Sequence, residues 1–106
     1  MDGSETQSII SVNVPSQGPF GVHLQEGPNG FAAEIINWER IDGKYGPVKK
    51  NGNVHIGYIL CGINDTPLDK IRFREAMRML KDPGIDKRVL QFLPKEIFIT
   101  ERFSYF

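Results

Sequence analysis

Short alternations of apolar and polar residues along the chain predict a series of β-strands. The alternation is clearest over residues 8–14, where β-branched side chains dominate before Pro15 stops the strand, and it returns over residues 22–25. Three further segments are more continuously apolar and are also predicted to be strands: residues 31–36, 58–63 and 88–93. A cluster of turn-forming residues at 26–30 joins the second and third strands, which predicts a hairpin.

One segment, residues 70–81, has the period of an amphipathic helix. Its apolar side chains follow the spacing i, i+3, i+4 and i+7, which places them on one helical face: Phe73, Ala76, Met77 and Leu80. Asp69 is expected to cap the start of this helix, and the turn-forming residues at 82–84 are expected to stop it.

Five or six short strands with one main and one short helix predict an α+β fold, a small and partly open β-barrel or sandwich. Residues 37–53 are expected to form a long connection with one short helical turn near residues 47–50. The predicted organisation is a disordered segment over residues 1–7, a domain over residues 8–94 and an apolar C-terminal extension over residues 95–106. This extension either adds a strand to the domain or marks an interface in a longer parent protein.

The charge balance narrows the classes of partner. The chain has 106 residues with 13 basic and 13 acidic side chains, so its formal net charge is zero. Bulk nucleic-acid binding favours a strongly basic domain, and no nucleic-acid partner is expected here. All the basic residues lie from Arg40 onward, an asymmetry that concerns partners rather than fold. The apolar runs are far shorter than the roughly 20 residues that a membrane-spanning helix needs.

Few residues are available for metal or redox chemistry. Cys61 is the only cysteine, which excludes an internal disulfide, and His23 and His55 lie in different segments. We therefore predict no metal site and no cofactor. No secretory signal precedes the first strand, so a cytoplasmic location is expected, free or peripheral to a membrane or the cytoskeleton. No nucleophile motif accompanies either histidine, and we do not expect an enzyme.

The segment Pro19-Phe20-Gly21-Val22 carries the most chemical information. Gly21 permits backbone conformations that other residues avoid, and Pro19 lacks an N–H, so the amide donors are those of Phe20, Gly21 and Val22. Successive amides in such a turn converge on an anion, such as the terminal carboxylate of a peptide. The alternative is an ordinary glycine-containing turn in which Phe20 packs as a staple, and the segment alone does not decide between the two.

Two further motifs follow this loop in the chain. Residues 57–65 form an apolar run between a glycine and an Asn-Asp turn, and Leu68 then precedes the helix over residues 73–81. Loop, strand and helix in this order resemble those of a PDZ domain, whose loop has the form x-Φ-G-Φ (Φ apolar) and whose later strand has the form G-D-x-Φ-Φ-x-Φ-N-G. The resemblance extends from Ile9 to Leu93, about four-fifths of the chain.

The resemblance implies a non-catalytic module that binds the C-terminal peptide of a partner protein. The peptide would add as an antiparallel strand to residues 22–25, with its carboxylate on the amides of Phe20, Gly21 and Val22. The groove between this strand and the helix would be lined by five side chains: His23, Leu24, Phe73, Met77 and Leu80. The helical stripe by itself would suit plain core packing better than a groove wall, and His23 could contact the penultimate ligand side chain or only solvent.

Three departures from the family pattern refine this expectation. Gln17 stands where PDZ domains usually carry Lys or Arg, which implies weaker carboxylate capture that depends on the amides. Phe73 replaces the histidine that would donate a hydrogen bond to a ligand Ser or Thr, so a Φ-x-Φ C-terminus is expected. Tyr58 replaces the Asp after Gly57, which we interpret as local structure.

A basic flank beside the groove gives the alternative function. Its members lie on one side of the predicted helix: Lys70, Arg74, Arg78 and Lys81. Three roles are open for this flank: an ordinary solvated face, the selection of acidic residues in a ligand, or contact with anionic lipid headgroups. The alternative is therefore a membrane-surface or assembly adaptor that uses this flank and the apolar tail. The last residues, Ser104, Tyr105 and Phe106, also resemble a PDZ ligand, which suggests binding of this tail to its own groove or that of a neighbouring copy.

Overall fold

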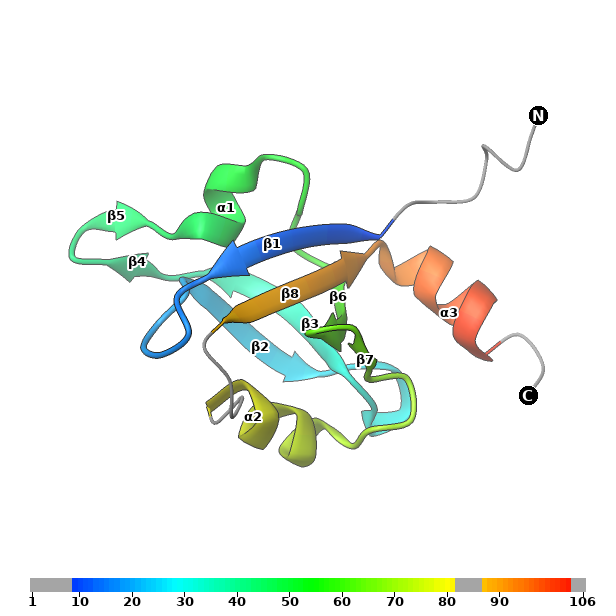
Figure 1. Cartoon of the computed structure of the whole chain (residues 1–106). Coiled ribbons are helices and arrows are strands. Elements are labelled where there is room, and N and C mark those ends of the chain that lie inside the picture. Colours follow the sequence, from blue (N-terminus) through cyan, green and yellow to red (C-terminus); the bar gives the residue numbers. More distant parts are fainter. Residues whose placement is uncertain (1–8, 82–86, 104–106) are drawn as a thin grey trace.

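Six strands form one open antiparallel sheet in the computed structural model, which describes residues 9–81 and 87–103 (Figure 1). The strand order is β1-β8-β6-β3-β2, with β7 paired to β6, so β1 and β2 are its two edges. The bounds are β1 Ile10–Val14, β2 Val22–Glu26, β3 Ala33–Trp38, β6 Ile59–Ile63, β7 Thr66–Pro67 and β8 Arg88–Leu93. The α+β class and the open sheet confirm the prediction.

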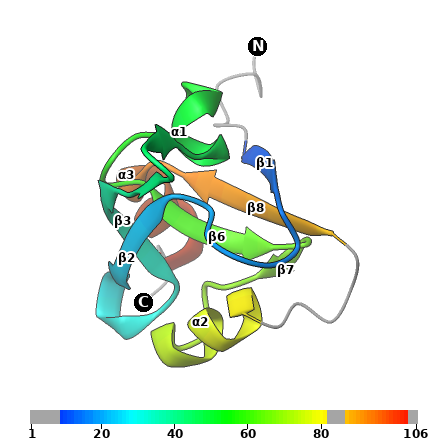
Figure 2. The same cartoon turned by 90° about the vertical axis from the view of Figure 1, so that its left-hand side faces the viewer.

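Three helices and a small ribbon accompany this sheet. The helices are α1 Pro47–Asn51, α2 Phe73–Lys81 and α3 Lys95–Phe103, and the ribbon pairs β4 Arg40–Ile41 with β5 Lys44–Tyr45. In both views α1 and α2 lie on opposite sides of the strands (Figures 1 and 2). The central strand β6 is buried along its whole length, and the core gathers around it.

The connection over residues 37–53 is more structured than the sequence suggested. Its short helical turn near residues 47–50 is confirmed by α1, which begins at Pro47. The rest of the connection was expected to be irregular, but it contains the β4–β5 ribbon. Asp42 and Gly43 between those strands both have positive φ, 53° and 80°, the conformation of a tight hairpin turn.

Helix α2 begins at Phe73, three residues later than the predicted start at Lys70. The predicted cap, Asp69, therefore lies outside the first helical turn, and the N–H of Ala76 donates to the carbonyl of Arg72 at 2.9 Å. The residues before α2 pair with another segment instead of joining the helix. The carbonyl of Ile71 accepts a hydrogen bond from the N–H of Ala32 at 2.9 Å. This pairing with a distant segment takes the place of the first helical turn that the local sequence pattern predicts. The predicted stop at residues 82–84 lies outside the described residues.

The same pairing moves the third strand. Phe31 forms an isolated bridge with Arg72, so β3 starts at Ala33 rather than at residue 31 and continues to Trp38. A short 3-10 turn, Pro28–Gly30, precedes it. The hairpin between β2 and β3 is present, with register shift between His23 and Leu24.

Residues 95–103 form a helix, and not the additional strand that was one expectation for this segment. The N–H of Phe98 donates to the carbonyl of Pro94 at 2.9 Å, and the Phe98 side chain is fully buried in the core. Lys95 pairs with Glu34 of β3 at 3.1 Å. Phe98 and the partly buried Ile97 pack against the core, so a helix and not a strand buries the apolar side chains of this segment. The last residues, 104–106, which were expected to bind a groove as a ligand, lie outside the described residues.

Candidate functional site

The edge strand β2 faces α2 across an unpaired side. In the described chain β2 pairs with β3 alone, and both views place α2 beside its other edge (Figures 1 and 2). Its side chains alternate, with Val22 buried, His23 exposed and Leu24 half-buried. The unpaired backbone groups of an edge strand are a template for another strand. The arrangement therefore leaves room for an extended peptide between β2 and α2.

The loop before β2 is held tightly by a neighbouring segment. Gly21 has φ of 88°, and a Cβ built on it would lie 3.1 Å from the Glu39 carbonyl and from the backbone of Gly46. The N–H of Glu39 also donates to the carbonyl of Gly21 at 2.9 Å. Within the described chain, the amides of Phe20 and Gly21 donate to no backbone acceptor. Successive main-chain donors in a turn are the groups from which anion sites are built.

An open cavity of about 820 Å³ lies along the outer side of this groove. It is lined by the end of β2, the 3-10 turn and one side of α2: Glu26, Gly30, Arg72, Phe73, Arg74, Met77, Arg78 and Lys81. The cavity thus combines an apolar floor from Phe73 and Met77 with four basic side chains and one carboxylate. The charge around the cavity is therefore mainly positive.

The predicted groove residues fall into two groups. Phe73 and Met77 line the cavity, whereas Leu80 is 3% exposed and belongs to the core that underlies the groove. Leu24 packs against the same core from β2, as Phe20 does from the loop. Ala76, on the same helical face, is fully buried.

The predicted basic flank is brought together only in part. Arg74, Arg78 and Lys81 line the cavity, and Arg78 also lies 3.4 Å from Glu75. Lys70 precedes α2 and does not line the cavity. The flank therefore borders the groove and is not a separate surface.

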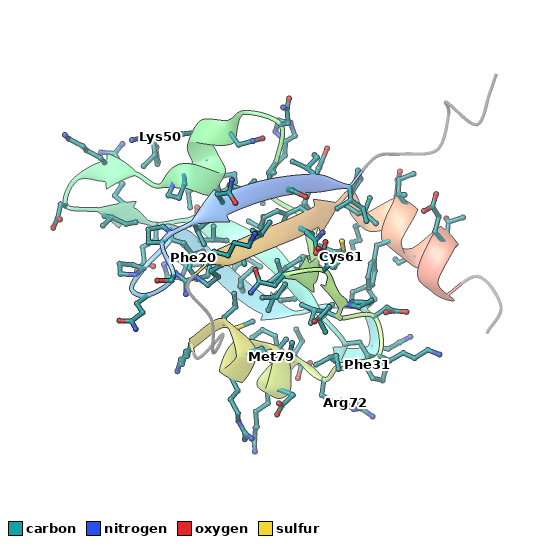
Figure 3. The ribbon with its side chains drawn as sticks, in the orientation of Figure 1. Phe20, Phe31, Lys50, Cys61, Arg72 and Met79 are labelled. Carbon is teal, nitrogen blue, oxygen red and sulfur yellow. The ribbon has the colours of Figure 1, made fainter. Side chains whose placement is uncertain are left out.

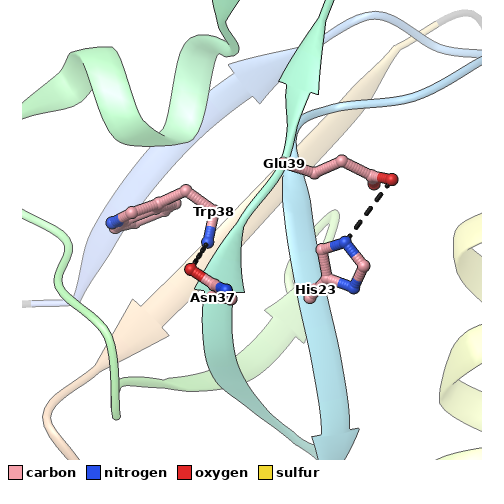
Figure 4. Close-up of polar contacts among 4 residues, drawn as sticks. All are labelled: His23, Asn37, Trp38 and Glu39. Atoms are coloured by element: carbon pink, nitrogen blue, oxygen red, sulfur yellow. Dashed lines mark hydrogen bonds and ion pairs between the residues drawn. The ribbon is translucent and has the colours of Figure 1, made fainter.

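His23 lies on the exposed face of β2 and reaches back toward the next strand. Its Nε2 is 3.4 Å from the Glu39 carboxylate, and about half of each side chain is exposed (Figure 4). Beside it, the carboxamide oxygen of Asn37 accepts a hydrogen bond from the N–H of Trp38 at 2.8 Å. His23 is thus placed at the rim of the candidate site, where both solvent and a ligand side chain can reach it.

Sequence reasoning missed the arginine that holds the loop against α2. Arg88 is 3% exposed, and its two terminal nitrogens donate to the carbonyls of Leu80 and Gly18, each at 2.8 Å. Its guanidinium lies 5.0 Å from the centre of the Phe20 ring (Figure 3 labels Phe20). The available signal was a charged residue at the first position of an otherwise apolar strand, where an unpaired charge would be costly to bury.

A second arginine closes the other end of the groove. Arg72, immediately before α2, lies with its guanidinium 4.5 Å from the centre of the Phe31 ring. Figure 3 labels both residues. Its backbone also bridges to Phe31. The start of α2 is therefore fixed to the connection between β2 and β3.

Comparison with known proteins identifies the fold. No family model and no curated protein matches the sequence. Among solved structures, the PDZ domain of choanoflagellate GIPC bound to GAIP peptide is 25% identical with a TM-score of 0.60, over 83% of this chain and 91% of that chain. The same domain bound to B1AR peptide is 27% identical, with the same TM-score and coverage.

A more distant structure gives the same result. The third PDZ domain of Dlg1 from the choanoflagellate Monosiga brevicollis is 15% identical with a TM-score of 0.59, over 91% of this chain and 95% of that chain. The protein therefore has a PDZ-like fold, as the resemblance in its sequence indicated.

The tight contact around Gly21 gives a testable consequence. Gly21→Ala and Gly43→Ala should both suffer the cost of a left-handed backbone, about 1–2 kcal/mol. Only at Gly21 would the added methyl also meet backbone atoms, because nothing lies within 4 Å of a Cβ at Gly43. Urea unfolding should therefore show that Gly21→Ala lowers the free energy of unfolding by at least about 1 kcal/mol more. Equal losses would show that the loop is not packed as described.

Proposed function

We propose that the protein is a non-catalytic interaction module that binds the C-terminal peptides of partner proteins. The observation that carries the proposal is the edge strand β2, which is open toward α2 and preceded by a loop with available amides. The GIPC domain of similar fold has been solved with two different peptides, which supports the same mode here. The peptide would extend the sheet through main-chain hydrogen bonds, and its alternate side chains would enter pockets.

The carboxylate would be held by main-chain donors. The amides of Phe20, Gly21 and Val22 start β2, and a terminal carboxylate at this point would accept charge-assisted hydrogen bonds from them. Gln17 brings no positive charge to the loop, so these amides carry the capture of the ligand's end. Peptide binding of this kind is expected near micromolar, or about 8 kcal/mol.

The apolar side chains would select the ligand. The terminal side chain would enter between Val22, Leu24 and Met77, above the buried Leu80. Phe73 cannot donate a hydrogen bond and lines the cavity with Met77, so an apolar residue two before the end would fit best. We therefore propose a preference for a Φ-x-Φ C-terminus.

The basic flank would act on the same ligand. Arg74, Arg78 and Lys81 line the cavity together with Phe73, so we assign them to acidic residues upstream in the peptide. A membrane-surface adaptor is less well supported, because Phe98 of the apolar C-terminal extension is buried in the core and does not face a membrane. Among the described residues no helix is both long and apolar enough to cross a membrane. We propose a reducing compartment such as the cytoplasm, because the sequence has a single cysteine, Cys61, and so no internal disulfide.

Capture of the free carboxylate can be measured with one pair of peptides. An acidic hexapeptide that ends in Val-Ala-Val should bind roughly 10- to 100-fold more tightly than its C-terminally amidated form, because charge-assisted hydrogen bonds contribute about 1.5–3 kcal/mol. Isothermal titration calorimetry of both peptides gives the ratio. Equal affinities for the acid and the amide would contradict the proposed function.

The role of Phe73 can be tested by restoring a donor. Phe73→His should shift the preference from Val-Ala-Val toward the isosteric Thr-Ala-Val by roughly threefold to tenfold, the contribution of one neutral hydrogen bond. Glu75→His is the matched control, because it places the same ring on α2 outside the cavity. Fluorescence anisotropy with both peptides measures the ratio. If both variants show the same shift, or if Phe73→His shows none, then Phe73 does not select the ligand.

A further inference from the structure

Arg88 is a buried cation whose described partners are all neutral. It donates to the carbonyls of Leu80 and Gly18 and stacks on Phe20, and its Nε–H has no partner among the described residues. No ion pair to Arg88 is present among the described side chains. Burial lowers the pKa of the Arg88 guanidinium, but arginine keeps its proton at neutral pH. Among the described residues, Arg88 therefore places a positive charge without an anionic partner in a poorly solvated site.

The contacts of Arg88 join the two walls of the candidate site. Gly18 and Phe20 belong to the loop that presents the amides, and Leu80 belongs to the last turn of α2. The carbonyl end of a helix favours a cation, which helps to hold the guanidinium there. One side chain thus fixes the distance between the loop and α2 at the end of the groove where a carboxylate would be captured.

A buried charge also acts through space. Burying a cation without an anion costs free energy, and an anion placed nearby recovers part of it. Coulomb interactions are stronger where water is excluded, so a charge beneath the loop is felt more than one on the surface. The sequence places Gln17, and no Lys or Arg, before the loop. Arg88 is the positive charge that the described structure brings next to this loop.

We propose that Arg88 is the positioning residue of the carboxylate loop, which it fixes against α2, and that its charge supplies the attraction for a carboxylate that the loop itself lacks. The proposal rests on the proposed function, because it requires that a peptide carboxylate binds at Phe20–Val22. Arg88 does not touch the ligand. It holds the loop backbone in place and attracts an anion electrostatically. Its removal should therefore weaken binding of the free-acid peptide far more than binding of the amidated peptide.

The test measures the ratio of acid to amide affinity in variants. In Arg88→Met this ratio should fall by about tenfold from its wild-type value, while the affinity for the amidated peptide changes by less than about threefold. Arg88→Lys should recover at least half of the lost ratio on a logarithmic scale, because it keeps the charge. Lys70→Met is the control, because it removes an exposed positive charge that does not line the cavity, and its ratio should equal that of the wild type.

The outcomes distinguish a failure of the proposed function from a failure of the role proposed for Arg88. If the wild type binds acid and amide equally, the proposed function fails. If the wild type discriminates but Arg88→Met weakens both peptides by the same factor, Arg88 is only structural and the inference is overturned. A failure of Arg88→Lys to recover the ratio overturns the role of the charge.

A measurement on the wild type covers the case in which Arg88→Met does not fold. The Nε–H of Arg88 is buried without a partner among the described residues, so its ¹⁵N-¹H resonance should shift when the acid peptide binds and shift much less with the amide at equal saturation. The spectrum of Arg88→Lys assigns the resonance. Equal shifts with both peptides, or no shift with either, would overturn the proposal.

Discussion

The separation between β2 and α2, fixed at both ends by arginine side chains, is the constraint on which the candidate site depends. At one end Arg88 bonds to Gly18 and Leu80, and at the other Arg72 packs on Phe31. Both contacts join the helix to the loops that flank the strand. With α2 joined to these loops, β2 keeps one unpaired edge beside the helix, where an extended peptide could bind.

The loop that starts β2 obeys a second constraint, set by close backbone approach. A side chain on Gly21 would bring its Cβ to 3.1 Å from the backbones of Glu39 and Gly46, so the loop is closely packed there. The ribbon and α1 therefore serve as a support for the loop, although they lie away from the groove. This support explains why a connection that is irregular in its sequence pattern is ordered in the structure: its turns hold the amides that the proposed function requires.

Sequence pattern predicted what depends on local periodicity and not what depends on distant pairing. The alternation over β1 and β2 and the helical spacing of Phe73 and Met77 were sufficient for the class of fold and for one wall of the cavity. The start of α2 was wrong because Ile71 bonds across the molecule. Arg88 was missed because its contact with Gly18 spans 70 positions of the sequence, and local spacing does not reveal a contact of that kind.

The central claim is that a peptide joins the sheet at β2, and hydrogen–deuterium exchange resolved by NMR tests this most directly. With a saturating C-terminal peptide, the amides of Val22–Glu26 that point away from β3 should exchange at least tenfold more slowly, because they gain main-chain acceptors. The amides along the opposite edge, in Ile10–Val14, should keep their rates. Unchanged exchange in β2, or protection that appears at β1 instead, would contradict the account.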